Sequence, residues 1–125
     1  MNKLRDLIQE KLEEIQDLEV TSEIPDSMLE KDKTYFSYNL QKTYSNSDFD
    51  KNFTYRINLT GYLKRLENPE ENTLEITDKI ADEIEKKLKD LNIKSSYIDI
   101  SVIDGIRKKQ ILGEVKYNEI NNRLV

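Results

Sequence analysis

The chain has 125 residues, a length that suits one ordinary domain, and it contains neither cysteine nor histidine. The absence of these two residue types excludes disulfides, zinc sites of the usual kinds and histidine-based nucleophilic triads. The net charge of −5 argues against a general nucleic-acid-binding surface, which needs a basic footprint. Apolar and charged residues each make up 36%, so we expect a modest core beneath a heavily charged surface.

The N-terminal stretch MNKLRDLIQEKLEEIQDL is charged throughout and lacks the apolar segment of a signal peptide. No run of the sequence approaches the roughly 18 apolar residues that a membrane-spanning helix needs. We therefore expect a protein that is made and kept in a cytoplasm and has no membrane contact.

The first predicted element is an amphipathic helix over residues 2–18. Its apolar residues fall on one side at helical spacing: Leu4, Leu7, Ile8, Leu12, Ile15 and Leu18. Residues 19–33 lack a sustained period and contain Pro25, which predicts a loop with one short turn anchored by Met28 and Leu29.

Two strands and a second helix follow. Residues 34–44 and 53–63 alternate between apolar and polar side chains, which predicts an antiparallel pair with one buried face. The segment LENPEEN interrupts the pattern, and Pro69 cannot serve a central strand. The periodicity then predicts a helix over 73–91, with Asn72 as its N-cap, Glu75 three residues further on and Asn92 at its C-terminal stop.

The segment 97–117 predicts a β-hairpin because Asp104-Gly105 is a strong two-residue turn signal. A simple register would place Ile98 opposite Ile111 and Ile100 opposite Lys109. Lys109 and Arg107 would then lie on the core-facing side near the tip, where a charge is costly. We therefore expect the tip to project from the domain, and we expect residues 118–125 to form a flexible tail.

Together these elements predict a single α+β domain over residues 1–125. Its sheet would have four strands, mainly antiparallel, with two helices on one face, in the order α-β-β-α-β-β.

The sequence indicates no catalytic, cofactor-binding or metal-binding residue. The acidic segment ENPEEN fits a solvated loop and a helix N-terminus, which favours carboxylates. Arg107, Lys108 and Lys109 form the only basic cluster, beside Ile103 and Ile106. Two interpretations of the cluster stay open: protection of an edge strand by charge, and an arm that contacts a neighbouring subunit.

Charge along the chain favours the second interpretation. Residues 2–19 have a net charge of −3, and residues 105–125 have a net charge of +3. Opposed and non-identical patches suit head-to-tail association, which closes into a ring when the rotation permits. On this hypothesis Arg107, Lys108, Lys109, Ile103 and Ile106 lie in a subunit interface.

The assembled pattern resembles the tail-terminator and minor tail-completion proteins of long-tailed bacteriophages and related contractile particles. The resemblance lies in the order, spacing and size of the pieces along almost the whole chain. These pieces are LRDLIQEKLEEI, YFSYNL, FTYRINLTGYL, ITDKIADEIEKKL and YIDISVIDGIRKKQILGEVKYNEI.

The resemblance implies a structural virion protein rather than an enzyme, with no cofactor. Such proteins form a ring, commonly of six subunits, on the head-proximal end of the tail tube in the tail or neck of the virion. The implied partners are further copies of the chain, the tail tube protein and the head-side connector protein. DNA would pass through the ring without specific binding, and an acidic lumen would repel its phosphates.

Two alternatives come from other functional classes. One is a non-enzymatic cytoplasmic binding or regulatory module that forms a sheet-mediated dimer. The other is a carboxylate-dependent enzyme, which the absence of histidine and cysteine disfavours.

Overall fold

The structure is a computed structural model that describes residues 2–23, 25–43, 54–118 and 123–124. The elements in chain order are α1 (Asn2–Glu13), β1 (Leu18–Thr21), the 3₁₀ helix η1 (Asp26–Met28), β2 (Thr34–Thr43), β3 (Thr54–Leu66), α2 (Thr73–Asp90), β4 (Lys94–Ile103), β5 (Ile106–Asn118) and β6 (Arg123–Leu124). The predicted α+β class is confirmed. The predicted four-stranded sheet is wrong, because the strands form a mixed sheet in the order β1-β2-β3-β5-β4, and β6 pairs with β5.

The additional strand β1 lies where the sequence predicted the end of a helix and the start of a loop. Helix α1 ends at Glu13, and Asp17 turns the chain with a φ of 61°. Residues 18–21 then pair in parallel with residues 34–37 of β2. Four residues are too few to show a clear alternation, so tertiary pairing rather than local pattern makes this strand.

The pairing of β2 with β3 confirms the predicted antiparallel strands. Phe36 lies opposite Leu63, and Leu40 lies opposite Leu59. The connection between the two strands, which the sequence predicted to be a long polar loop, lies outside the described residues.

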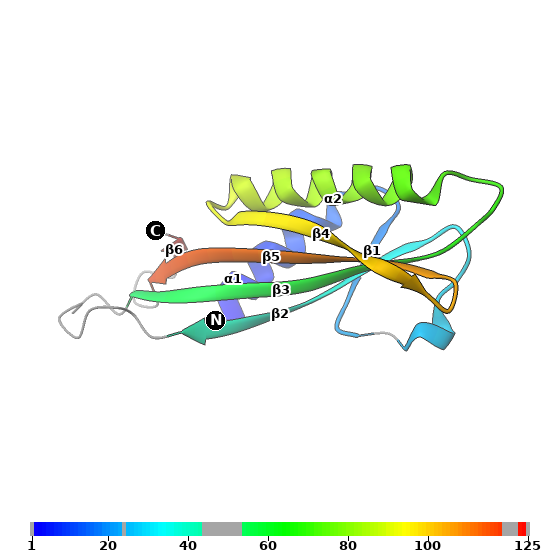
Figure 1. Cartoon of the computed structure of the whole chain (residues 1–125). Coiled ribbons are helices and arrows are strands. Elements are labelled where there is room, and N and C mark those ends of the chain that lie inside the picture. The colour runs from blue at the N-terminus through cyan, green and yellow to red at the C-terminus, as the bar shows by residue number, and fades with distance from the viewer. Residues whose placement is uncertain (1, 24, 44–53, 119–122, 125) are drawn as a thin grey trace.

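Both helices cover the same face of the sheet, as predicted, and Figure 1 shows α2 running along it beside β4. One core joins the helices to the inward-facing strand positions. The buried apolar residues of this core are Leu4, Ile8, Leu12, Ile15, Phe36, Tyr38, Ile57, Leu59, Leu63, Ile80, Ala81, Ile84, Leu88, Ile93, Ile111 and Val115. A smaller cluster of Leu29, Tyr35 and Ile106 lies on the opposite, outer face, where the segment around η1 covers one end of the sheet.

The ends of α2 follow the prediction. The Asn72 side chain accepts a hydrogen bond from the Glu75 backbone N–H at 3.1 Å and donates one to the Glu75 carboxylate at 3.2 Å. Asn92 has a φ of 61°, which is the left-handed conformation that ends helices. Local capping chemistry therefore sets the limits of this helix.

The β4–β5 hairpin has the predicted turn but a different register. Ile103 lies opposite Ile106, and an irregularity between Ile100 and Ile103 then shifts the pairing by one residue. Tyr97 rather than Ile98 lies opposite Ile111, so the predicted core position of Ile98 is wrong, and its side chain is 55% exposed.

The expectation that the hairpin tip projects from the domain is also wrong. Strand β5 lies between β3 and β4 along the tip, and Leu66 of β3 pairs with Ile106. The Glu67 backbone N–H also donates to the Gly105 carbonyl at 2.8 Å. At the other end, within the segment predicted to be a flexible tail, Asn118 belongs to β5 and Arg123–Leu124 forms β6. The rest of that segment lies outside the described residues.

Gly61 makes the close packing of Phe36 possible, because a Cβ at position 61 would lie 2.3 Å and 2.5 Å from two atoms of the Phe36 ring. Phe36 is fully buried in the core, so the ring has little space to move. We expect Gly61→Ala to lower the free energy of unfolding by about 1–3 kcal/mol, as overpacking of a core does. Urea denaturation measures the change.

The neighbouring substitution Thr60→Ala is the control, because that side chain lies on the outer face, and it should cost less than about 1 kcal/mol. Phe36→Leu in the Gly61→Ala background should recover part of the loss. A Gly61→Ala protein as stable as the wild type would contradict the packing argument.

Candidate functional site

The five residues predicted to form a subunit interface divide into three environments. Ile103 is 49% exposed at the hairpin tip. Ile106 is buried against Leu29 and Tyr35 on the outer face. The three basic side chains bind acidic groups of the same chain.

Arg107 and Lys108 each hold a segment that leaves the sheet. The Arg107 guanidinium donates two hydrogen bonds to the Glu67 carboxylate, at 2.9 Å and 3.1 Å, and these raise the pKa of Arg107. Lys108 and Lys64 each donate to the Asp26 carboxylate at 3.0 Å. The two lysines lower the pKa of Asp26 and fix η1 over the outer face.

Lys109 is fully buried on the helix-covered face. Its ammonium group donates hydrogen bonds to Asp78 of α2 and to Asp99 of β4, and it lies 5.2 Å from the centre of the Tyr97 ring. The Tyr97 hydroxyl donates to Asp82 at 2.9 Å, and this bond contributes most to raising the pKa of Tyr97 to about 12. Two carboxylates and an aromatic ring thus replace the water that a buried ammonium loses.

The basic cluster therefore stabilises the fold of its own chain. The sequence reasoning assumed that a charge at an inward-facing position would force the tip out of the domain. It did not consider that α2 and β4 could each supply a carboxylate to Lys109. Whether these side chains also touch a neighbouring subunit stays a prediction.

Exposed apolar side chains gather beside this cluster. Among the described residues, the large apolar side chains that are exposed are Met28, Tyr62, Leu74, Ile98, Val102, Ile103 and Leu112. All but Met28 and Leu74 lie on β3, β5 and β4. We call Ile98, Ile100, Val102 and Ile103 of β4 the apolar edge, because β4 ends the described sheet and has no further strand beside it there.

The sequence did not indicate the apolar edge, because the simple register turned Ile98 and Ile100 into the core. The missed signal is Asp99, which lies between them and can approach Lys109 only if β4 is shifted by one residue. Within this edge Asp99 is the sole charged residue, and its side chain binds Lys109 while staying 57% exposed. The edge thus has a single, already paired carboxylate and none of the lysines that often protect edge strands.

The outer face next to the apolar edge is uncharged over its central part. The outward positions there, identified from the strand registers, are Ser37, Asn39, Gln41, Asn58, Thr60, Tyr62, Ser96, Ile98, Gln110 and Leu112. Charged side chains border this area and several are paired, as in the 3.0 Å contact between Arg56 and Glu114. In a chain with 36% charged residues, an area without charged side chains that exposes Tyr62, Ile98 and Leu112 shares the depletion of charge found at interface cores.

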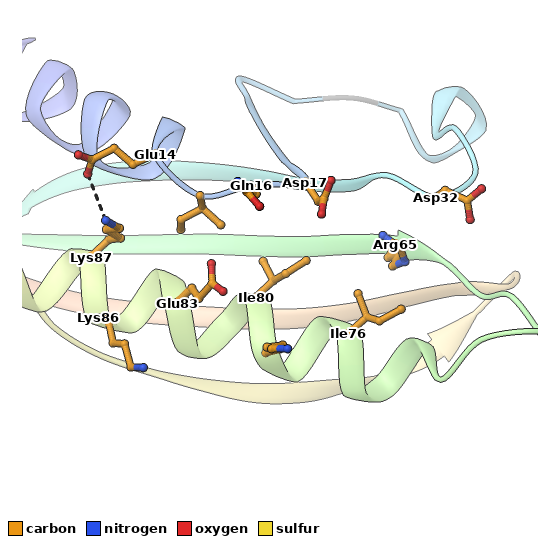
Figure 2. Close-up of a pocket in the computed structure, with 12 residues that line it drawn as sticks. Glu14, Gln16, Asp17, Asp32, Arg65, Ile76, Ile80, Glu83, Lys86 and Lys87 are labelled. Carbon is orange, nitrogen blue, oxygen red and sulfur yellow. Dashed lines mark hydrogen bonds and ion pairs between the residues drawn. The ribbon is translucent and has the colours of Figure 1, made fainter.

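A cleft of about 750 Å³ lies on the helix-covered side, between the end of α1 and α2. Figure 2 shows Glu14 and Lys87 bridging its two walls, with a contact of 3.3 Å between the carboxylate and the ammonium group. Arg65 lies at one end, and its guanidinium already binds Glu71 through two hydrogen bonds and Thr34 through one. Because these donors are occupied, Arg65 is a poor ligand for a bound anion.

No group of three acidic side chains with metal-binding geometry occurs within residues 2–23, 25–43, 54–118 and 123–124. Helix α2, the longest helix of the described chain, is too polar to cross a membrane, and no other described helix could do so.

No protein-family model and no curated protein sequence matches this chain.

Substitutions of Lys109 and of its two partners, Asp78 and Asp99, test whether the buried ammonium group needs these carboxylates. The double substitution Asp78→Asn/Asp99→Asn leaves a buried ammonium without a counter-charge, and we expect a loss of about 3–5 kcal/mol in unfolding free energy. Lys109→Met removes the buried charge and leaves two partly exposed aspartates that water can solvate, so it should cost less. The triple variant Asp78→Asn/Asp99→Asn/Lys109→Met should be more stable than Asp78→Asn/Asp99→Asn. Chemical denaturation of the wild type and the three variants measures this order of stability. Equal losses of unfolding free energy in all three variants would contradict it.

The Asp26 contacts predict a specific response to acid. Because its folded pKa lies below 3.8, Asp26 contributes stability above pH 3.8, and this contribution is lost as the pH falls through the folded pKa. We expect Asp26→Asn to cost no more than about 1 kcal/mol at pH 7, since the pairs are partly exposed. The difference from the wild type should vanish at low pH.

Thermal unfolding from pH 7 to pH 2 measures this difference. Asp104→Asn is a suitable control, because Asp104 lies in the exposed hairpin turn. A constant difference between Asp26→Asn and the wild type over the whole range would contradict the role of the Asp26 carboxylate.

Proposed function

We propose that this protein is a non-enzymatic structural protein that assembles into a ring on the head-proximal end of a bacteriophage tail tube. In that place it caps the tube and offers the surface that the head-side connector protein joins. The proposal rests on the sequence resemblance described above and on one structural observation, which is the exposed apolar edge of the sheet.

The apolar edge supports the proposal because it combines two routes to association. Ile98, Val102 and Ile103 are 43–55% exposed, so a partner would remove apolar surface from water. The backbone of an edge strand also has hydrogen-bonding groups that a partner strand can satisfy. One side of β4 packs under α2, so a partner would approach along the free edge and the outer face (Figure 1).

The structure contains the elements on which the resemblance rests, together with an additional strand, β1, between the opening helix and the strand pair. The strands form one mixed sheet, and both helices cover one of its faces. Such a subunit has an open sheet face for contacts with other proteins, while the helices keep the core closed.

The apolar edge also suits the alternative, a cytoplasmic module that forms a dimer through its sheet. The two differ in the number of subunits and in the symmetry of the assembly. The mass of the particle in solution and its appearance in electron micrographs separate them.

We expect the purified protein, or the protein added to tail tubes, to form rings with a mass several times that of the 14.8 kDa chain. Ile98→Lys/Val102→Lys should abolish the rings and leave a folded monomer, because both side chains are exposed and the fold does not bury them. Light scattering, electron microscopy and thermal unfolding measure the mass, the shape and the fold.

Met28→Lys/Leu74→Lys is the matched control, because it adds the same charge at exposed apolar positions away from the edge. The control should still form rings. A wild type that stays a monomer or a two-fold dimer under all these conditions would end the proposal of a ring.

A further inference from the structure

The two ends of the described sheet are compatible with each other. Strand β1 ends it on one side and β4 on the other. Strand β1 runs parallel to β2, and each step from β2 through β3 and β5 to β4 is antiparallel. Strands β1 and β4 therefore run in opposite directions. Copies placed side by side in the same orientation would bring β4 of one next to β1 of the other as an antiparallel pair.

The two ends also lie at the same height along the strands. Thr21 of β1 is level with Ser37, Tyr62, Gln110 and finally Ile98 of β4, as the successive registers show. In the same way Glu19 is level with Ile100. Strand β1 thus spans the height at which the apolar edge begins, and no large shift along the strands is needed for the two to meet.

Charge distinguishes the two ends in a complementary way. Residues 13–33, which include β1 and its flanking turns, contain eight carboxylates and two lysines. Four of these carboxylates form ion pairs within the chain, namely Glu14, Glu19, Asp26 and Glu30. The carboxylates of the segment that form no ion pair among the described residues are Glu13, Asp17, Glu23 and Asp32. Residues 86–94, which lead from α2 into β4, contain four lysines and one aspartate, a net charge of +3. Lys89 and Lys94 are exposed and line a groove of about 490 Å³ between α2 and β4. Opposite charges of this kind orient two surfaces and accelerate their association.

We propose that β4 of one copy pairs with β1 of the next, so that the sheet continues from subunit to subunit in a head-to-tail ring. This inference rests on the ring proposed above and names the surfaces that build it. A two-fold pairing of β4 with β4 would leave the acidic β1 end of each copy without a partner. The head-to-tail arrangement uses both ends of every subunit.

The contact keeps the existing cover of β4 in place. The Glu85 carboxylate accepts a hydrogen bond from the Tyr97 backbone, which lies just outside the height that β1 spans. The open part of the edge begins at Ile98, and the neighbouring β1 would cover it from Ile98 past Ile100.

Disulfide trapping tests the proposal, because the chain has no cysteine of its own. Three variants are needed: Thr21→Cys, Ile98→Cys and the double variant with both changes. Both positions lie on the outer face at the same height, on opposite ends of the sheet. Under mild oxidation the double variant should form a ladder of covalent oligomers in non-reducing electrophoresis, and each single variant should stay at the mass of one chain.

Covalent dimers from Ile98→Cys alone would overturn the head-to-tail arrangement in favour of β4–β4 pairing. A double variant that forms rings by light scattering and yields no ladder would also overturn it, while the proposed ring would stand. A wild type that does not assemble would instead contradict the proposed function. When Lys89→Glu/Lys94→Glu is added to the double-cysteine variant, the covalent ladder should form at least tenfold more slowly at low salt. The difference in rate from the double-cysteine variant alone should shrink as salt is added.

Discussion

The buried ammonium group of Lys109 is the constraint on which the shape of the hairpin depends. Alternation along β5 turns this side chain toward the core, where a charge without partners would be too costly to keep. One partner, Asp78, comes from α2, and the other, Asp99, comes from β4 directly opposite Lys109. An uninterrupted hairpin from the Asp104-Gly105 turn would place Ile100 in that position. The one-residue irregularity near the tip therefore accompanies the neutralisation of Lys109.

The same irregularity determines which side chains face solvent. It turns Tyr97 and Asp99 inward and leaves Ile98 and Ile100 on the outer face. The neutralisation of the buried Lys109 and the exposure of the apolar edge thus both follow from one change in register. Tyr97 links them, because its ring lies beside the Lys109 ammonium while its hydroxyl binds Asp82 of α2.

Strong local signals explain what could be predicted from the sequence. The capping pair of Asn72 and Glu75, the apolar spacing of α2 and the Asp104-Gly105 turn each depend on a few neighbouring residues, and all three are found in the structure. Strand β1 and the hairpin register depend on contacts between distant segments. Residues 18–21 become a strand through their pairing with β2, and Asp99 faces inward because Lys109 is there. Single-sequence periodicity contains no information about such contacts, so the sequence did not predict that Arg107, Lys108 and Lys109 bind carboxylates of their own chain.

The basic side chains and the apolar edge differ in the free energy that their burial in a subunit interface would cost. Arg107 and Lys108 already have carboxylate partners, and moving these ion pairs into an interface would cost desolvation with little new attraction. Exposed isoleucine and valine side chains have no such cost, and each square ångström that a partner covers contributes about 25 cal/mol. Unpaired lysines near the start of β4 and carboxylates around β1 would orient the approach, while the apolar edge and the strand backbone would hold the contact. In specific protein interfaces, charged groups at the border orient the partners and apolar groups at the centre hold them together. The edge of β4 is therefore a stronger candidate for the subunit contact than the basic residues beside it.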